Sequence, residues 1–339
     1  MAKKGEFLAS GSSVKVVVTA IAGNTLVTCA KAIGWFFTAS PSMLAETIHS
    51  AADTANQILI FVGIKQSEKK ANRFFPWGHG HARYVWNLIS AMGIFFIGFG
   101  FTTYHGVSSL FHPHSEPADK VLLIALSILL FSFIVEGYAF WVAYKEVKIM
   151  KGSLSFKQFI KQCDDPTVVG VLLEDGVAVL GVIIAAICIL LSRYFHWAFA
   201  DAVGSIIIGV MMGFMALLLS FLNGKLLIGA AVGEIKEKEY KAFIESMPVI
   251  DKVLSMTAVI LGAGQIHLAA NIELYEEALL HRKRIESDVE AIKAGKDVAS
   301  VLVKRSVRMV RVVGEEIRKI ETELKKKYPE ILTVELEVH

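Results

Sequence analysis

The first 230 residues contain six apolar runs, and these runs constrain the fold more than any other feature. They lie at 14–37, 42–64, 86–111, 120–144, 167–192 and 199–222. About 20 apolar residues suffice for a helix to cross a bilayer. The hydrophobic share of the chain, 54%, is also high for an ordinary soluble domain. The sequence therefore predicts a membrane all-α domain of six transmembrane helices over residues 1–230.

The positive charges between the runs predict how these helices are oriented. Twelve Lys and Arg residues lie in the N-terminal segment and in two long connections, 65–83 and 145–165. Only Lys120 and Arg193 lie at the opposite ends. Because cytoplasmic loops carry the excess of Lys and Arg, we expect a multi-pass protein with both termini cytoplasmic. Nothing resembles an Arg- and Ser-rich mitochondrial leader, so a prokaryotic inner membrane is the simplest placement.

Residues 231–339 read as a separate soluble α+β domain. Helical periodicity at 234–247 is followed by alternating, β-branched segments at 249–261 and 264–274. A long charged helix is expected at 298–327 and a last strand at 331–339. The net charge of +3 does not indicate a nucleic-acid partner. The three cysteines show no pairing pattern, which argues against a disulfide framework or a thiolate zinc site.

Four polar side chains interrupt the second apolar run. They are Glu46, His49, Asp53 and Asn56. Their spacing of three, four and three residues puts them on one face of a helix. An ionisable group near the bilayer centre costs about 2.5–3.5 kcal/mol on insertion scales, so this face is expected to meet an ion, a cavity or a partner. His49 and Asp53 could bind one cation, and a buried hydrogen-bonded pair is the alternative.

A second acidic site lies in the fifth run, where Glu174 and Asp175 are adjacent. Neighbouring helix positions point about 100° apart, so only one of the two is expected to face His49 and Asp53. His49, Asp53 and Asp175 would supply one nitrogen and at least two oxygen ligands. A fourth ligand could be Glu174, Glu46 or water. Such a mixed set suits zinc, and also manganese, iron or cobalt.

Other ionisable residues in or near the spans are weighed in the same way. For Glu136, in the fourth run, a hydrogen bond between helices and a proton or metal relay are equally open. Lys31, near the outer end of the first run, is expected to snorkel toward water and to have no role in function. His79, in the glycine-rich loop after the second run, could bind a peripheral metal. Glu46, Asn56, Glu136 and His79 are thus the predicted accessory or proton-relay residues.

Several motifs resemble the cation diffusion facilitator family of zinc and related metal transporters. His49-Ser-Ala-Ala-Asp53 matches that family's paired ligands on the second span. FPWGHGHAR at 75–83 and DAVGSIIIG at 201–209 resemble its loop after that span and the start of its sixth span. The sequences IHSAADTANQ, DPTVVGVLLEDGVAVLGV and ELKKKYPEILTVELEV are similar to the zinc transporter nine subgroup. The likeness covers nearly the whole chain. At Val171, four residues before Asp175, the family's usual ligand is missing, which leaves Glu174 as the substitute.

The resemblance implies a fold and an activity. It implies a ferredoxin-like cytoplasmic domain, a homodimer, and export of a divalent metal, zinc first, from the cytoplasm by proton antiport. The metal is then a substrate and not a cofactor, and the protein is not an enzyme. Metal binding displaces protons, and histidine, with an unperturbed pKa of about 6.5, suits that exchange. The alternatives are a non-transporting membrane scaffold or metal sensor acting through the tail, and an intramembrane metalloenzyme. The latter lacks an HExxH-type motif.

Overall fold

The computed structural model describes residues 11–112, 119–152, 154–162, 166–195, 197, 199–275 and 282–339. The chain divides into two compact units, Met1–Ile228 and Gly229–His339. The expected N-terminal charges Lys3 and Lys4 lie outside the described residues.

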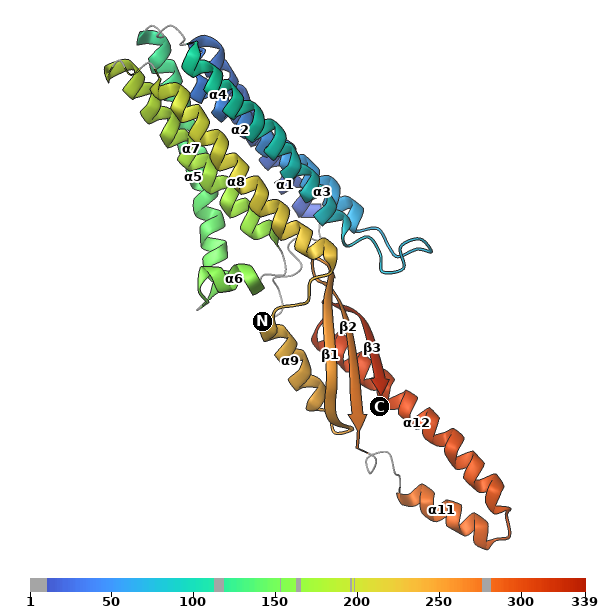
Figure 1. The fold of residues 1–339 in the computed structure, drawn as a ribbon. Helices are drawn as coiled ribbons and strands as arrows, with labels where there is room; N and C mark the ends of the chain where they lie inside the picture. The colour runs from blue at the N-terminus through green and yellow to red at the C-terminus, as the bar shows by residue number, and fades with distance from the viewer. Residues whose placement is uncertain are drawn as a thin grey trace. The chain divides into compact units, whose positions relative to one another are not determined.

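The first unit is helical (Figure 1). Its helices are α1 (Gly11–Thr38), α2 (Pro41–Ser67), α3 (Ala82–Gly93), a π-helical stretch η2 (Ile94–Phe101), α4 (Thr102–Phe111), α5 (Asp119–Lys151), α6 (Phe156–Gln162), α7 (Pro166–Phe195) and α8 (Ala200–Ile228). Within the described residues, four helical segments are long and apolar enough to cross a membrane. They are Ala82–Phe111, Lys120–Lys151, Val169–Phe195 and Ala200–Ile228. The prediction of a helical membrane domain is confirmed.

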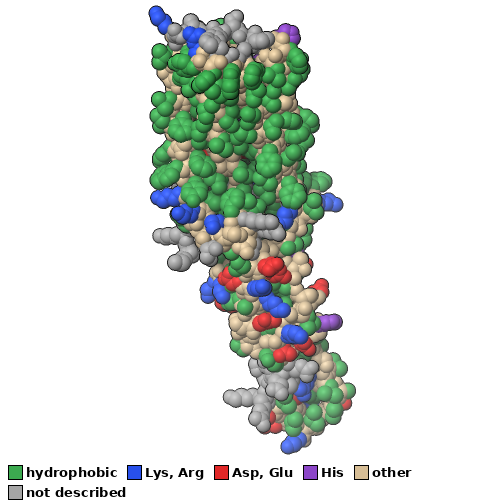
Figure 2. Space-filling model, turned by 60° about the vertical axis from the view of Figure 1, so that its left-hand side comes forward, with side chains coloured by type: hydrophobic (Ala, Val, Ile, Leu, Met, Phe, Trp, Pro, Cys, Tyr) green, Lys and Arg blue, Asp and Glu red, His purple; other side chains and the backbone are tan. Residues whose placement is uncertain are grey.

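Helix α2 lies at the centre of this unit, in contact with α1, α3, α7 and α8. Ser40 begins it as the N-cap, its hydroxyl accepting the Met43 amide hydrogen, and Pro41 follows where its missing N–H costs nothing. Met43 and Ala45 of α2 join Met212 and Ala216 of α8 in the apolar core. The outer surface is also apolar, as the green side chains of Figure 2 show. A helix that is apolar inside and outside is typical of a protein in lipid.

The second unit contains a three-stranded sheet in the order β1-β2-β3. Its strands are β1 (Ile250–Gly262), β2 (Gln265–Leu274) and β3 (Ile331–Val338), and its helices are α9 (Glu234–Glu245), α11 (Arg282–Lys293) and α12 (Val298–Lys327). β1 pairs antiparallel with β2 through a tight turn, and β3 pairs parallel with β2. A parallel pair needs a long crossover connection, and α12 lies within it. The predicted combination of helices and a small sheet is confirmed at this level.

Alternate residues of β2 form the core of this unit. Ile266, Leu268 and Ile272 are buried, in the period of two that a strand imposes. Helix α9 packs on β1 and α12 on β3. Their buried residues Ile244 and Leu324 complete the core.

Candidate metal centre

Helix α2 carries the polar face that the spacing predicts. His49 and Asn56 are buried, and Asp53 is partly buried. His49 Nε2 lies 3.3 Å from Asp53 Oδ2, one helical turn along. Both ring nitrogens of His49 and Asp53 Oδ1 are buried with no hydrogen-bond partner among the described residues. Because buried polar atoms are normally paired, these atoms are available as ligands.

Glu174 is the carboxylate of α7 that contacts α2. Its side chain is buried, and its Oε1 accepts a 2.5 Å hydrogen bond from Asn56 Nδ2. Asp175, one residue later, is only partly buried. The sequence pattern ranked Asp175 ahead of Glu174, whereas the contact between the two helices is made by Glu174. Val171, at the position where the resemblance implies a further ligand, is 39% exposed.

The carboxylates and the histidine do not form a closed coordination shell. Within the part of the chain that the structure describes, no three His, Cys, Asp or Glu side chains lie close enough to hold one metal ion. Zinc takes four ligands at about 2.0–2.3 Å. Binding of an ion would therefore require shorter distances between His49, Asp53 and the carboxylates of α7.

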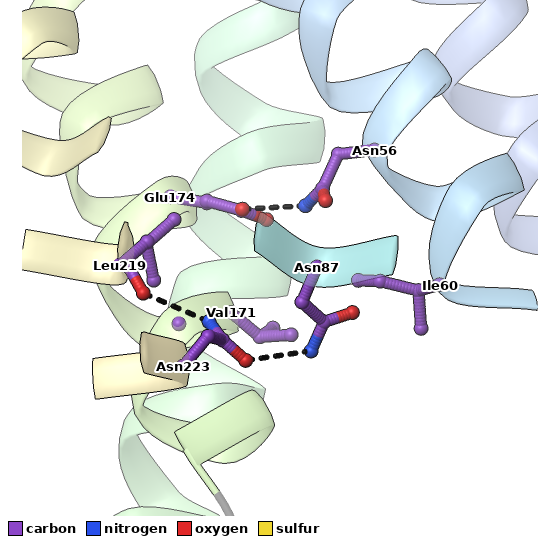
Figure 3. Close-up of a pocket in the computed structure, with 8 residues that line it drawn as sticks. Asn56, Ile60, Asn87, Val171, Glu174, Leu219 and Asn223 are labelled. Atoms are coloured by element: carbon purple, nitrogen blue, oxygen red, sulfur yellow. Dashed lines mark hydrogen bonds between the residues drawn. The ribbon is translucent and has the colours of Figure 1, made fainter. Parts of the chain in front are cut away.

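A small cavity of about 20 Å³ adjoins Glu174 (Figure 3). That is about the space of one water molecule. It is lined by Asn56, Ile60, Asn87, Gly170, Val171, Glu174, Leu219 and Asn223. Asn87 Nδ2 donates to Asn223 Oδ1 at 3.3 Å, and Asn223 Nδ2 donates to the Leu219 carbonyl at 2.9 Å. The cavity lies on the Ser67 side of the His49–Asp53 pair, since Asn56 follows Asp53 by one turn of α2.

Two residues of this cavity were missed in the sequence. Asn87 and Asn223 lie on α3 and α8, and both are buried. A single amide at the end of each of two apolar runs was the available signal, Asn87 within one and Asn223 just after the other. It was weak because the two are 136 residues apart and only the fold pairs them.

The expectation that Lys31 snorkels is wrong. Its side chain is 0% exposed, and its Nζ donates to Glu46 Oε2 at 2.6 Å and to Glu136 Oε1 at 2.7 Å. The ammonium finds two carboxylates inside the bundle, and this pairing replaces the water that a snorkelling lysine would seek. For Glu136, the contact is an ion pair between α5 and α1. Glu46, expected as an accessory ligand, makes the other half of the same bridge.

His79 lies away from the polar face of α2, in the connection between α2 and α3. A ring nitrogen is 3.3 Å from the Lys69 carbonyl, which it can reach as a donor, and the ring contacts Phe75. The structure thus brings together His49, Asp53, Asn56 and Glu174, adds Lys31 with Glu46 and Glu136, and leaves His79 in a loop.

The sequence of the helical unit matches a known family. Residues 17–228 match the family model described as the cation efflux transmembrane domain. The chain belongs to the cation efflux family. The predicted resemblance to the zinc transporter nine subgroup is confirmed by relatives that match over nearly the whole chain.

Three relatives of the cation efflux family illustrate the range of the match. The chain is 32% identical over 334 residues to the proton-coupled zinc antiporter SLC30A9, mitochondrial, of Homo sapiens, covering 96% of this chain and 58% of that protein. It is 32% identical over 341 residues to metal tolerance protein C4 of Arabidopsis thaliana, covering 96% and 74%. It is 22% identical over 204 residues to a cadmium, cobalt and zinc/H(+)-K(+) antiporter of Bacillus velezensis, covering 60% and 59%. The chain thus spans about three fifths of the length of the vertebrate relatives.

The expected prokaryotic inner membrane is wrong. The relatives matched over 96% of the chain are eukaryotic, and the vertebrate ones are named as mitochondrial, which contradicts that placement. The expectation relied on a missing leader-like stretch, and such an absence does not identify a membrane. The multi-pass membrane character is confirmed.

Proposed function

We propose that this chain exchanges a divalent metal cation, zinc first, for protons across a membrane. The metal would be exported from the side on which both termini lie. The cation efflux family membership and the proton-coupled zinc antiporters among its relatives support this activity. Manganese, iron and cobalt remain the other candidate substrates, since oxygen and nitrogen ligands accept them as well.

The observation that carries the proposal is the buried His49–Asp53 pair opposite Glu174. Its unpartnered nitrogen and oxygen atoms lie inside a membrane unit, where an unsatisfied polar group is costly. A divalent ion would use these atoms. We propose His49, Asp53, Asp175 and Glu174 as the ligands, and Asn56 as an accessory residue that holds Glu174 while no metal is bound.

Proton coupling follows from the ligands' chemistry. Metal binding needs a neutral imidazole and ionised carboxylates, so an ion and protons compete for the same atoms. If the site is open first to one side and then to the other, protons arriving from the far side would displace the metal. We propose rocking of the helices around α2 and α7 as the motion that changes access.

We propose the remaining features of the architecture together with this function. α1 and α2 complete a set of six spans, and the C-terminal unit is a ferredoxin-like domain through which two copies form a homodimer. The strand order with β1 antiparallel and β3 parallel to β2 is compatible with that fold. β3 is an outer strand with an edge available for pairing, whereas residues 230–232 already hydrogen-bond to part of the outer edge of β1.

The test is metal uptake into proteoliposomes with an imposed pH gradient. Zinc, manganese, iron and cobalt are compared for wild type, Asp53→Ala and Glu174→Ala. Asp53 offers an unpaired buried oxygen and Glu174 faces α2, so we expect each change to reduce saturable, proton-coupled flux at least tenfold. The order of initial rates then ranks the metals.

Glu146→Gln is the matched control, because Glu146 is an exposed carboxylate near the end of α5. It should transport like wild type. Absence of flux for every metal in folded wild-type protein would refute the transporter and favour a scaffold or sensor. Wild-type flux in both site variants would refute the location of the site.

A further inference from the structure

Lys31 joins three helices inside the membrane unit. Its ammonium, on α1, lies between Glu46 of α2 and Glu136 of α5, at 2.6 and 2.7 Å. Lys31 and Glu46 are fully buried, and the Glu136 side chain is 14% exposed. A charge in this setting is costly, so its retention calls for a specific reason.

The two carboxylates have ligand capacity beyond what Lys31 uses. Glu46 Oε1 and Glu136 Oε2 are buried and without a hydrogen-bond partner among the described residues. Glu46 Oε1 also lies where the side chain of Gly181 on α7 would be, and a Cβ built there would collide with it. Two carboxylates with free oxygens and a space kept open by a glycine form a position that a metal ion could occupy if the ammonium left.

This position adjoins the candidate metal centre. Glu46 precedes His49 by three residues, one helical turn toward Pro41, whereas the asparagine-lined cavity follows Asp53 on the other side. Along α2, the order is therefore Lys31 bridge, His49–Asp53 pair, cavity. An ion held at His49 would have this second cation position as its neighbour.

Charge and tethering decide which cation occupies it. The carboxylates together carry two negative charges, the ammonium supplies one positive charge, and a divalent ion would supply two. By charge alone, the divalent ion would be preferred. The ammonium has the advantage that it is attached to α1, so its effective concentration at the carboxylates does not depend on the solution.

We propose that Lys31 is a resident cation that fills the position between Glu46 and Glu136 and keeps a second divalent ion out of it. The membrane unit then holds one transported ion at a time. The proposal rests on the proposed function in one respect, that His49 and Asp53 form the transport site beside the bridge.

The test counts bound metal in the full chain. Wild type, Lys31→Met and Lys31→Arg are equilibrated with zinc or manganese ions in detergent, and metal per protomer is measured by elemental analysis after dialysis. Met is similar in length but uncharged, so Lys31→Met should bind one more ion per protomer than wild type.

Three further variants serve as controls. Lys31→Arg keeps the charge and should bind the wild-type number. Lys31→Met/Glu136→Gln should lose the extra ion. Lys225→Met, at an exposed lysine in the last turn of α8, is the matched control.

Thermal unfolding of the same samples tests the proposal even if Lys31→Met folds poorly. Lys31→Met should unfold at a lower temperature than wild type without metal and recover with zinc or manganese, since a divalent ion replaces the ammonium. An unchanged metal count, or a Lys31→Met protein that no metal stabilises, would overturn the proposal. If wild type binds no metal and Lys31→Met gains one ion, the resident cation stands and the transport site fails. If wild type binds metal and Lys31→Met gains none, the transport site stands and the resident-cation proposal fails.

Discussion

Asn56 and a metal ion bound by Glu174 would compete for the same carboxylate oxygen. Asn56 Nδ2 donates 2.5 Å to Glu174 Oε1, and both side chains are buried. An ion that takes the lone pair used by the amide has to displace it. In that case the hydrogen bond would stabilise the metal-free protein at the expense of metal affinity.

Asn56→Ala separates these two effects. Without metal, Glu174 loses its donor, and we expect the free energy of unfolding to fall by about 1–3 kcal/mol, the cost of an unpaired buried polar group. With metal, no amide has to be displaced, so zinc should bind more tightly than to wild type. Calorimetric zinc titration and thermal unfolding measure both. Unchanged zinc affinity in a destabilised variant would show that Glu174 is not a ligand.

At the residue scale, the sequence predicted what a single helix determines and missed what several helices determine. His49 and Asp53 share a face of α2 because their spacing requires it. Asp175 was ranked ahead of Glu174, but adjacent positions differ by about 100° and the choice depends on how α7 is rotated, which one helix does not determine. Lys31 was misjudged because its partners are 15 and 105 residues away, and no local pattern joins them.

At the scale of elements, glycines allow α4 and α8 to approach closely. A Cβ at Gly209 of α8 would lie 2.6 Å from Thr103 Oγ1 and 3.1 Å from the Thr103 amide nitrogen of α4. Backbone at that distance cannot rotate away as a flexible side chain can. Small residues at helix interfaces are how membrane helices gain packing without a hydrophobic driving force.

Gly209→Ala should therefore destabilise the helical unit. We expect about 1–3 kcal/mol, the usual cost of overpacking, seen as a lower unfolding temperature in detergent. Gly224→Ala on the same helix is the control, because nothing lies within 4 Å of a Cβ there. It should leave the unfolding temperature unchanged or raise it, since alanine favours helix over glycine. Equal losses in both variants would contradict close packing at Gly209.

The limits of most elements were predictable because prolines, charges and strand alternation mark them. Helix 298–327 and strands β1, β2 and β3 lie where these patterns indicated. The π-helical stretch Ile94–Phe101 was not foreseen. Gly98 within it lies against Met212 of α8, where a Cβ would be 2.5 Å from Met212 Cε. The local change of helix type is thus associated with contacts to another helix, which the periodicity of one segment does not contain.

At the scale of the whole molecule, the chain joins a unit whose outside is apolar to a unit that carries its own core. The first depends on lipid, whereas the second buries Ile244, Leu268 and Leu324 among its own helices and strands. A unit with a separate core and a hydrogen-bonded sheet has what a domain needs to fold alone.

Residues 229–339 should accordingly fold without the membrane unit, with cooperative denaturant unfolding followed by circular dichroism. Leu268, on the central strand, is fully buried, so Leu268→Ala should lower the free energy of unfolding by about 2–5 kcal/mol. Leu332→Ala is the matched control, because Leu332 on β3 is 46% exposed and its loss should cost far less. Gradual unfolding, or equal losses in the two variants, would show that the sheet depends on the helical unit.

Light scattering on the same fragment tests the proposed homodimer. A mass of two chains would support dimerisation through this unit. A mass of one chain would assign any dimer contact to the spans.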